Sequence, residues 1–273
     1  MTVGGIETRA VWSLGEGTSA VLLHGWMDNA DTWLELLDRL AARRRAAIAY
    51  DQPGFGVAPP LDPEREVLDQ LVDLGARTVL RAAERSGKPV VLVGNSLGGW
   101  TALRLAQHEE LPIAGVVAIG PAGIRMAPLF FTVDRIPAVS QLISLRAPVP
   151  DGVVRSVAGR LYRRLAFGNP AAVDQAVVDR FTRFTVDRAV IRTRIDYAKR
   201  VRPELADPFD PERIKAPVTV LWGDRDRLCI PAGAEDLRAR LPHARIEMLP
   251  GIGHTPQIEC PAVVANAVEA LAH

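Results

Sequence analysis

Cysteine and net charge are both scarce in this sequence. Its 273 residues include two cysteines, Cys229 and Cys260, which are too few for a disulfide framework and are expected to be small buried side chains in a reducing compartment. The formal net charge is only +1, so the chain lacks the basic excess typical of nucleic-acid-binding proteins. We therefore expect no nucleic-acid partner.

Long uninterrupted hydrophobic runs are also missing. The longest apolar stretch, residues 111–124, is broken by prolines and glycines, which predicts a buried strand and no stable membrane insertion. The first ten residues contain no apolar segment suited to a signal peptide. These absences favour a cytoplasmic location, with a processed precursor or a non-classical export route as the alternatives.

What the sequence does contain is an alternation of short apolar runs and longer helical patterns. Strands are predicted at residues 20–23, 46–50, 89–93, 113–119, 218–222 and 245–249. Helices are predicted at residues 38–45, 69–85, 97–107 and 263–271, and Gly87 and Pro89 mark the end of the second helix. This alternation is typical of an α/β protein, with a mostly parallel sheet and helices on both faces.

One segment interrupts the alternation. Residues 125–207 contain no strand-like run, and prolines divide a helical stretch rich in arginine. We interpret residues 125–207 as a helical cap inserted into a core formed by residues 1–124 and 208–273. The cap has 14 arginines and one lysine against eight acidic residues, a balance of +7, whereas the rest of the chain carries −6. This excess is either a solvated surface or an attraction for an anionic substrate or lipid surface.

The strongest chemical signal is the sequence Gly94-Asn95-Ser96-Leu97-Gly98 between a predicted strand and a predicted helix. A serine on such a sharp turn adopts a strained backbone conformation, and small residues two positions before and after it prevent collisions. The turn raises the hydroxyl group above the sheet and directs the next backbone N–H toward the same point. The motif predicts that Ser96 is a nucleophile.

A serine nucleophile needs a base, and the base needs a carboxylate. His254 lies in a loop after the last predicted strand, where it can reach the edge of the sheet that carries Ser96. The loop after the strand at 113–119 contains no acid, whereas residues 223–227 supply two, Asp224 and Asp226. Either one completes the chain order serine, acid, histidine that this arrangement requires.

The substrate oxygen requires two backbone donors. We expect the N–H groups of Leu97 and Trp26 to form this oxyanion hole, with Gly25 allowing close approach and His24 holding the loop from behind. The indole of Trp26 is also predicted to line the substrate pocket. The remaining predicted pocket residues are Asn95, beside the serine, and two apolar cap residues, Phe130 and Leu142.

Five segments in order resemble the α/β-hydrolase superfamily: LHGW at 23–26, DQPGFG at 51–56, GNSLGG at 94–99, GDRD at 223–226 and GHTPQIECP at 253–261. The resemblance spans nearly the whole chain. It implies the α/β-hydrolase fold with an eight-stranded, mostly parallel sheet and a helical cap, and it implies no metal and no cofactor. The family pattern also favours Asp226 over Asp224 as the catalytic acid.

Within this family, the predicted serine nucleophile, base, acid and oxyanion donors favour hydrolysis of a small or medium acyl substrate, most simply a carboxylic ester. One alternative is cleavage of a carbon–carbon bond in a dienoic acid, because Asn95 resembles the residue before the serine in meta-cleavage-product hydrolases. Those enzymes usually carry tryptophan after the catalytic histidine, where this chain has Thr255. Another alternative is a cofactor-free perhydrolase or haloperoxidase, which the sequence at 24–26 resembles. The expected partner is a small acyl substrate, and the expected state is a monomer or homodimer.

Overall fold

The central element is a twisted sheet that is parallel except at one edge. The computed structural model describes residues 2–3, 5–128, 150–184, 188–206 and 209–272. The strands of the sheet, in spatial order, are β3 (Ala10–Ser13), β5 (Arg45–Tyr50), β4 (Glu16–Leu23), β6 (Val90–Asn95), β7 (Ile113–Ile119), β8 (Val218–Gly223) and β9 (Arg245–Leu249). Only β3 runs antiparallel to its neighbour. The predicted mostly parallel sheet is confirmed.

The number of strands differs from the eight that the family resemblance implied. Seven strands form the main sheet of the described residues, and the N-terminal segments β1 (Thr2–Val3) and β2 (Ile6–Glu7) pair only with each other. Each has two residues, and Gly5 in the turn between them has a φ of +87°, a value that glycine adopts without steric penalty. Because this hairpin pairs locally, its residues do not extend the edge of the sheet.

Helices cover both faces of the sheet. The helical elements are η1 (Ala30–Trp33), α1 (Leu34–Ala42), α2 (Val67–Ser86), α3 (Leu97–Leu105), α6 (Asp151–Ala166), η3 (Pro170–Ala172), α7 (Gln175–Thr182), α8 (Arg188–Glu204), η4 (Pro211–Arg213), α9 (Gly233–Arg240), α10 (Pro256–Glu259) and α11 (Pro261–Leu271). Helix α2 ends at Gly87 in the left-handed conformation, as its sequence predicted. None of the described helices is long and apolar enough to cross a membrane.

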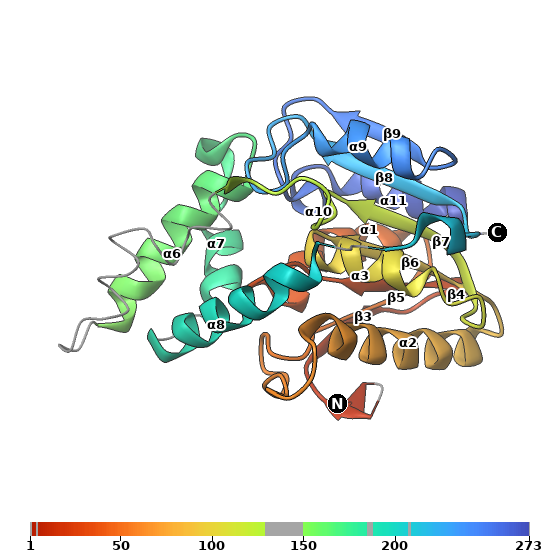
Figure 1. Cartoon of the computed structure of the whole chain (residues 1–273), viewed down its shortest axis with the longest axis horizontal. Coiled ribbons are helices and arrows are strands. Elements are labelled where there is room, and N and C mark those ends of the chain that lie inside the picture. The colour runs from red at the N-terminus through yellow and green to blue at the C-terminus, as the bar shows by residue number, and fades with distance from the viewer. Residues whose placement is uncertain (1, 4, 129–149, 185–187, 207–208, 273) are drawn as a thin grey trace.

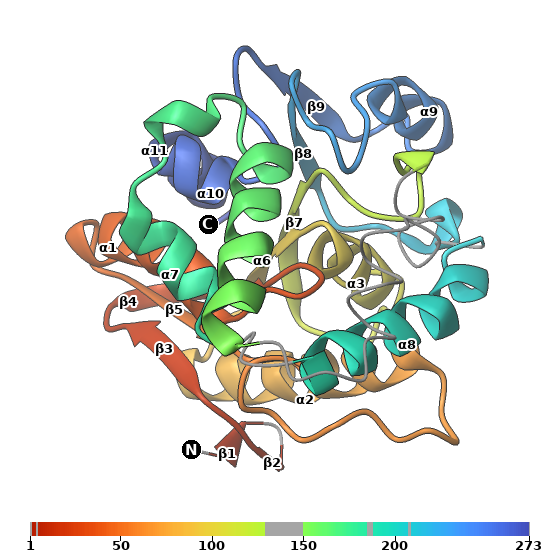
Figure 2. The ribbon, with the colours of Figure 1, turned by 90° about the vertical axis from the view of Figure 1, so that its left-hand side faces the viewer.

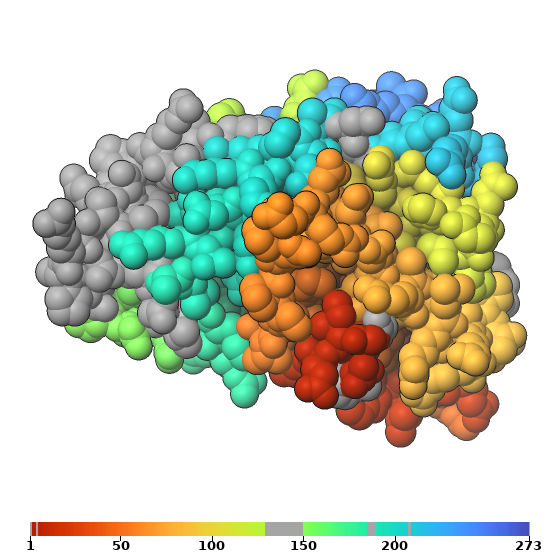
Figure 3. Space-filling view, turned by 60° about the horizontal axis from the view of Figure 1, so that its bottom comes forward, coloured from red at the N-terminus to blue at the C-terminus, as the bar shows by residue number. Residues whose placement is uncertain are grey.

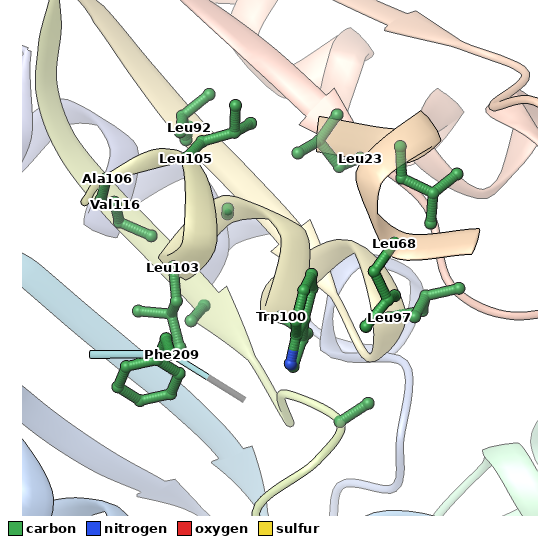
Figure 4. Packing of buried hydrophobic residues seen from close by; sticks show 14 of the residues in the cluster. Leu23, Leu68, Leu92, Leu97, Trp100, Leu103, Leu105, Ala106, Val116 and Phe209 are labelled. Atoms are coloured by element: carbon green, nitrogen blue, oxygen red, sulfur yellow. The ribbon is translucent and has the colours of Figure 1, made fainter. Parts of the chain in front are cut away.

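Two apolar clusters hold the layers together. Strand residues alternate between them, since Val90 and Leu92 face α2 and α3 whereas Val91 and Val93 face α1 and α11. Figure 4 shows the first cluster, in which Trp100 and other α3 side chains pack beside the strands. Because both faces of β6 are buried, its residues form the continuous apolar run seen in the sequence.

The helices that fall within the predicted cap lie beyond the ends of the sheet strands (Figure 1). Viewed from that side, α6, α7 and α8 stand in front of the sheet (Figure 2). The first residues of the segment stay attached to the core, because the N–H of Ala127 donates to Leu228 and the N–H of Ile230 donates to Arg125. Within the described part of residues 125–206 there is no strand, although Met126 forms an isolated bridge with Cys229.

Candidate active site

Ser96 stands at the junction of β6 and α3, with backbone angles φ 56° and ψ −115°. This conformation is rare for a residue with a side chain and is maintained only when its surroundings fix it. Here the N–H of Ser96 donates to Ile119, and its carbonyl accepts from Trp100 and Ala122. The turn is therefore held on both sides by α3 and by the end of β7.

Glycine is required on each side of this turn for a measurable steric reason. A Cβ atom at Gly94 would lie 2.1 Å from the carbonyl oxygen of Gly98, and one at Gly98 would lie 2.0 Å from the carbonyl oxygen of Leu23. Both contacts are with backbone atoms, which cannot move aside as a flexible side chain would. The expected need for small residues around Ser96 is explained by these two contacts.

His254 and Asp226 form a buried pair at the carboxyl ends of the strands. Nδ1 of His254 lies 2.7 Å from Oδ2 of Asp226, and the other carboxylate oxygen, Oδ1, accepts the N–H groups of Leu228 and Cys229. These bonds hold the carboxylate in one orientation, so Asp226 fixes the proton of His254 on Nδ1 and leaves Nε2 free to act as a base.

Asp224, the alternative acid, has a different partner. Its Oδ1 accepts the N–H of Gly251 at 2.7 Å, and its side chain is exposed. This bond fixes the turn that precedes the histidine but places no carboxylate against the imidazole. Of the two acids left open by the loop sequence, the geometry thus brings Asp226 to His254.

The three predicted catalytic residues converge, although Ser96 and His254 are not directly bonded. A Cβ at Gly120 would lie 3.0 Å from Oδ2 of Asp226 and 3.5 Å from Nδ1 of His254. The Ser96 hydroxyl oxygen lies 4.0 Å from Sγ of Cys229, and between the described residues Ser96 and His254 there is no hydrogen bond. Such contacts are commonly long without substrate and shorten in the reacting complex.

The two predicted oxyanion donors lie next to this convergence. Leu97 is the first residue of α3, so its N–H has no partner within the helix. Among the described residues neither this N–H nor that of Trp26 donates a hydrogen bond. Gly25 brings the two segments together, since a Cβ there would lie 3.2 Å from Cβ of Ser96. The arrangement leaves two amides available for an oxygen that develops negative charge.

His24 has the supporting position that the sequence predicted. It is fully buried, its Nδ1 lies 2.8 Å from the carbonyl oxygen of Gly25, and its Nε2 accepts the N–H of Gln52. These two partners require a neutral ring with its proton on Nδ1. Burial lowers the pKa of His24 to about 4, so the ring stays neutral near pH 7 and holds the loop that carries Trp26.

The predicted pocket residues lie in different surroundings. Trp26 is half-buried and contacts the ring of Phe55 edge-on at 5.3 Å. Asn95 is buried, and its amide donates to the carbonyl of His254 at 2.8 Å, so it joins the end of β6 to the histidine loop. Phe130 and Leu142 lie outside the described residues.

The end of α6 is attached to the loop that carries His254. The backbone N–H of His254 donates to Ala166 at 2.7 Å. Glu259 accepts the N–H groups of Gly168 and Gly253, both at 2.8 Å, and so joins the two segments through one carboxylate. Arg227 donates to the carbonyl of Phe167. The position of the candidate base therefore depends on the end of α6 as well as on its own loop.

Two residues in the site were not singled out by the sequence. Asp28, two positions after Trp26, is buried and accepts the N–H of Asn29. Burial raises its pKa to about 7, and the electrostatic interaction with His254 opposes this shift. Cys229 was expected only as a small buried side chain, which it is, but it also contacts both Ser96 and Asp226. The sequence contained a signal for Asp28, because an acid two residues after the predicted oxyanion donor Trp26 must lie close to the nucleophile.

Comparison with known proteins identifies the family. The model of the alpha/beta hydrolase family matches residues 20–267. Monoacylglycerol lipase ABHD6 of Rattus norvegicus is 24% identical over 93% of this chain and 75% of its own length. The pimeloyl-[acyl-carrier protein] methyl ester esterase of Nitrosomonas europaea is 27% identical over 94% of this chain and 96% of its own.

A solved structure with the same fold is the 2-hydroxy-6-oxo-6-phenylhexa-2,4-dienoate hydrolase of Rhodococcus sp. strain RHA1. It superposes with a TM-score of 0.71 at 19% identity, over 97% of this chain and 99% of that one. At this identity the likeness establishes the shared arrangement of sheet and helices and leaves the substrate open.

Proposed function

The chain belongs to the alpha/beta hydrolase family, and from this premise we propose that it is a serine hydrolase that cleaves a carboxylic ester of a small or medium acyl group through an acyl-enzyme on Ser96. The observation that carries the proposal is the buried contact between His254 and Asp226 at the carboxyl ends of the strands, beside a serine on a strained turn. Neither element alone would activate a hydroxyl group, whereas together they supply a nucleophile and an oriented base.

In the proposed reaction, the ester carbonyl oxygen accepts hydrogen bonds from the N–H groups of Leu97 and Trp26. Nε2 of His254 removes the Ser96 proton as the serine oxygen attacks the carbonyl carbon. The same imidazolium then protonates the departing alcohol, which leaves an acyl group on Ser96. Water then attacks the acyl carbon as His254 removes its proton, which forms a second tetrahedral intermediate. The bond from the acyl carbon to Ser96 breaks, the imidazolium returns the proton to the serine oxygen, and the acid leaves.

The names of the relatives support ester cleavage over other reactions. Both the lipase from rat and the esterase from Nitrosomonas are named for hydrolysis of carboxylic esters. The alternative is carbon–carbon cleavage of a dienoic acid, because the dienoate hydrolase of Rhodococcus has the same fold. The same triad can attack a ketone, so the substrate decides between the two.

The direct test labels the nucleophile and compares the two substrate classes. A serine-directed phosphonate should label the wild-type protein and not Ser96→Ala, and the variant should lose turnover by on the order of 10⁴-fold or more while unfolding at the same temperature. A panel of 4-nitrophenyl esters of increasing chain length, run beside one meta-cleavage dienoate, then assigns the reaction. Equal labelling of both proteins would remove Ser96 from the mechanism, and turnover of the dienoate alone would replace esterase by carbon–carbon hydrolase.

A further inference from the structure

Arg194 of α8 occupies an unusual position for a charged residue. Its guanidinium lies over the ring of Phe55, 4.7 Å from the ring centroid, and 6.0 Å from the ring of Tyr197. Both rings are buried. An arginine placed over aromatic faces in this way is partly desolvated, and the rings compensate only part of the hydration that it loses.

The helix that carries Arg194 is fixed on the core by the turns that follow. The hydroxyl of Tyr197 accepts the N–H of Leu61, and Glu204 accepts the two N–H groups of Val67 and Leu68 at the start of α2. Figure 3 shows the turquoise surface of α8 lying against the orange segment that precedes α2. Because Arg194 precedes Tyr197 by three residues, the two side chains lie on the same face of α8, which these bonds hold against the core.

No acidic side chain neutralises this cation among the described residues. The ion pairs of the described chain include none to Arg194, whereas Arg9, also partly buried, contacts both Asp31 and Asp51. The carboxylate of Asp51, whose charge acts on Arg194, already accepts from Arg9, Ala30 and Val57. Burial accordingly lowers the pKa of Arg194. Burial also acts to lower the pKa of Arg9, but its bonds to Asp51 and Asp31 outweigh that effect and raise the pKa.

Arg194 is separated from the candidate oxyanion loop by a single aromatic ring. Phe55, which it covers, contacts Trp26 at 5.3 Å and His24 at 5.7 Å between ring centroids. A cation that has no acidic partner among the described residues is thus one ring away from the loop whose Trp26 N–H would hold the reacting carbonyl. A cation in such a place is stabilised when a ligand supplies the missing negative charge.

We propose that Arg194 binds a carboxylate carried by the substrate, so that the preferred substrates are esters with a free acid group, such as monoesters of dicarboxylic acids or esters of hydroxy acids. The inference rests on the proposed esterase function and narrows it. The planar guanidinium matches a carboxylate through two parallel hydrogen bonds. Such a pair selects the acid-bearing ester over a neutral ester of equal length.

The experiment measures kcat/KM for two matched pairs of esters. One pair places the charge in the acyl group, with mono-4-nitrophenyl adipate against 4-nitrophenyl hexanoate, and the other places it in the leaving group, with 4-acetoxybenzoate against phenyl acetate. In at least one pair, Arg194→Gln should lower the rate for the acid by about 10- to 100-fold and change the neutral ester by less than about 3-fold.

Arg200→Gln is the matched control. It removes the same charge from the same helix, also beside Tyr197, but its guanidinium is already bonded to the carbonyls of Asp62 and Arg65. It should change the preference for acids by less than about 2-fold. Equal losses in the two variants, or equal losses for acid and neutral esters in Arg194→Gln, would overturn the proposal.

A measurement on the wild-type protein alone guards against a folding defect in the variant. The ratio of rates for acid and neutral esters should fall as ionic strength rises, because salt screens the attraction between the substrate and the cation. A ratio that stays constant would also overturn the proposal. If the wild-type protein hydrolyses none of the four esters, the proposed esterase function itself fails, which is a distinct result.

Discussion

Nδ1 of His254 lies 2.7 Å from Oδ2 of Asp226, and both side chains are almost completely buried. In this environment the contact determines which ring nitrogen carries the proton, because water is not available to stabilise the other tautomer. The preceding acid, Asp224, is bonded to the backbone of Gly251 instead. Two acids separated by one residue thus have different tasks, and substitution can separate them.

Asp226→Asn should reduce kcat/KM on the best ester by on the order of 10²-fold or more, because an amide favours the wrong tautomer of His254. Asp224→Asn removes an acid of the same loop and should retain most of the activity. Phosphonate labelling rates of Ser96 provide a second measurement that does not depend on the substrate chosen. Equal losses in the two variants, or a larger loss in Asp224→Asn, would reverse the assignment.

Much of the fold could be predicted because the signals are local. The segment predicted at 245–249 coincides with β9, an edge strand that is only partly buried. The apolar run at 113–119 coincides with β7, since a parallel strand covered on both faces leaves a continuous apolar pattern. The short edge strand β3 (Ala10–Ser13) was missed, because an edge strand contains exposed residues such as Trp12 and lacks that pattern. The helix predicted at 38–45 is α1, which begins at Leu34 and ends at Ala42.

The candidate site could be predicted where a backbone requirement or a chain-order rule constrains the residue type. Ser96 and its glycines belong to the first kind, and His254 to the second. The contacts of Asn95 and Cys229 could not be predicted, because each joins segments that are far apart in the sequence. Asn95 contacts His254 across 159 positions, and Cys229 contacts Ser96 across 133. No periodicity in a single chain encodes such pairs.

Gly98→Ala should destabilise the protein by more than about 2 kcal/mol and lower activity, because the new methyl group would meet the carbonyl of Leu23 at the base of the oxyanion loop. Urea unfolding monitored by tryptophan fluorescence measures the change in the free energy of unfolding. Gly152→Ala is the control, since a Cβ there meets nothing within 4 Å and the residue is helical. It should be neutral or slightly stabilising. Equal stability of the two variants would contradict the steric argument.

His24 should make the wild-type protein less stable in acid. Its pKa is lowered from 6.5 to about 4 by burial, so between these values the unfolded chain binds a proton that the folded chain does not. The free energy of unfolding therefore falls as the pH is lowered through this range, by on the order of 3 kcal/mol from this residue. The His24→Gln variant lacks this titration and should show a shallower pH dependence, even though its stability at pH 7 is lower.

The comparison of these two proteins isolates His24, because the other four histidines are present in both. Urea unfolding at half-unit intervals between pH 4 and pH 7 gives the two curves. If the curves are parallel, His24 takes up its proton in the folded protein over the same pH range as in the unfolded chain, and the hydrogen bond that it accepts from Gln52 does not hold the ring neutral in acid.

Asp28 should produce the opposite dependence. Burial raises its pKa from 3.8 to about 7, with Asp51 adding to the shift and the hydrogen bond from Asn29 and the charge of His254 opposing it. Between these values the folded protein keeps a proton that the unfolded chain has lost. Raising the pH from 4 to 7 therefore favours unfolding, by on the order of 1 kcal/mol per pH unit at most. Above pH 7 the contribution is constant.

The Asp28→Asn variant has no carboxyl group at this position, so its stability relative to wild type should increase from pH 4.5 to pH 7.5. Asp31→Asn provides a control in the same segment, because Asp31 pairs with Arg9 and its loss should destabilise the protein at pH 7.5. Urea unfolding of the three proteins at both pH values measures the differences. A constant difference between Asp28→Asn and wild type would mean that Asp28 is ionised throughout. In that event a permanent negative charge would lie near His254, and the imidazolium formed in each turnover would be stabilised by two carboxylates instead of one.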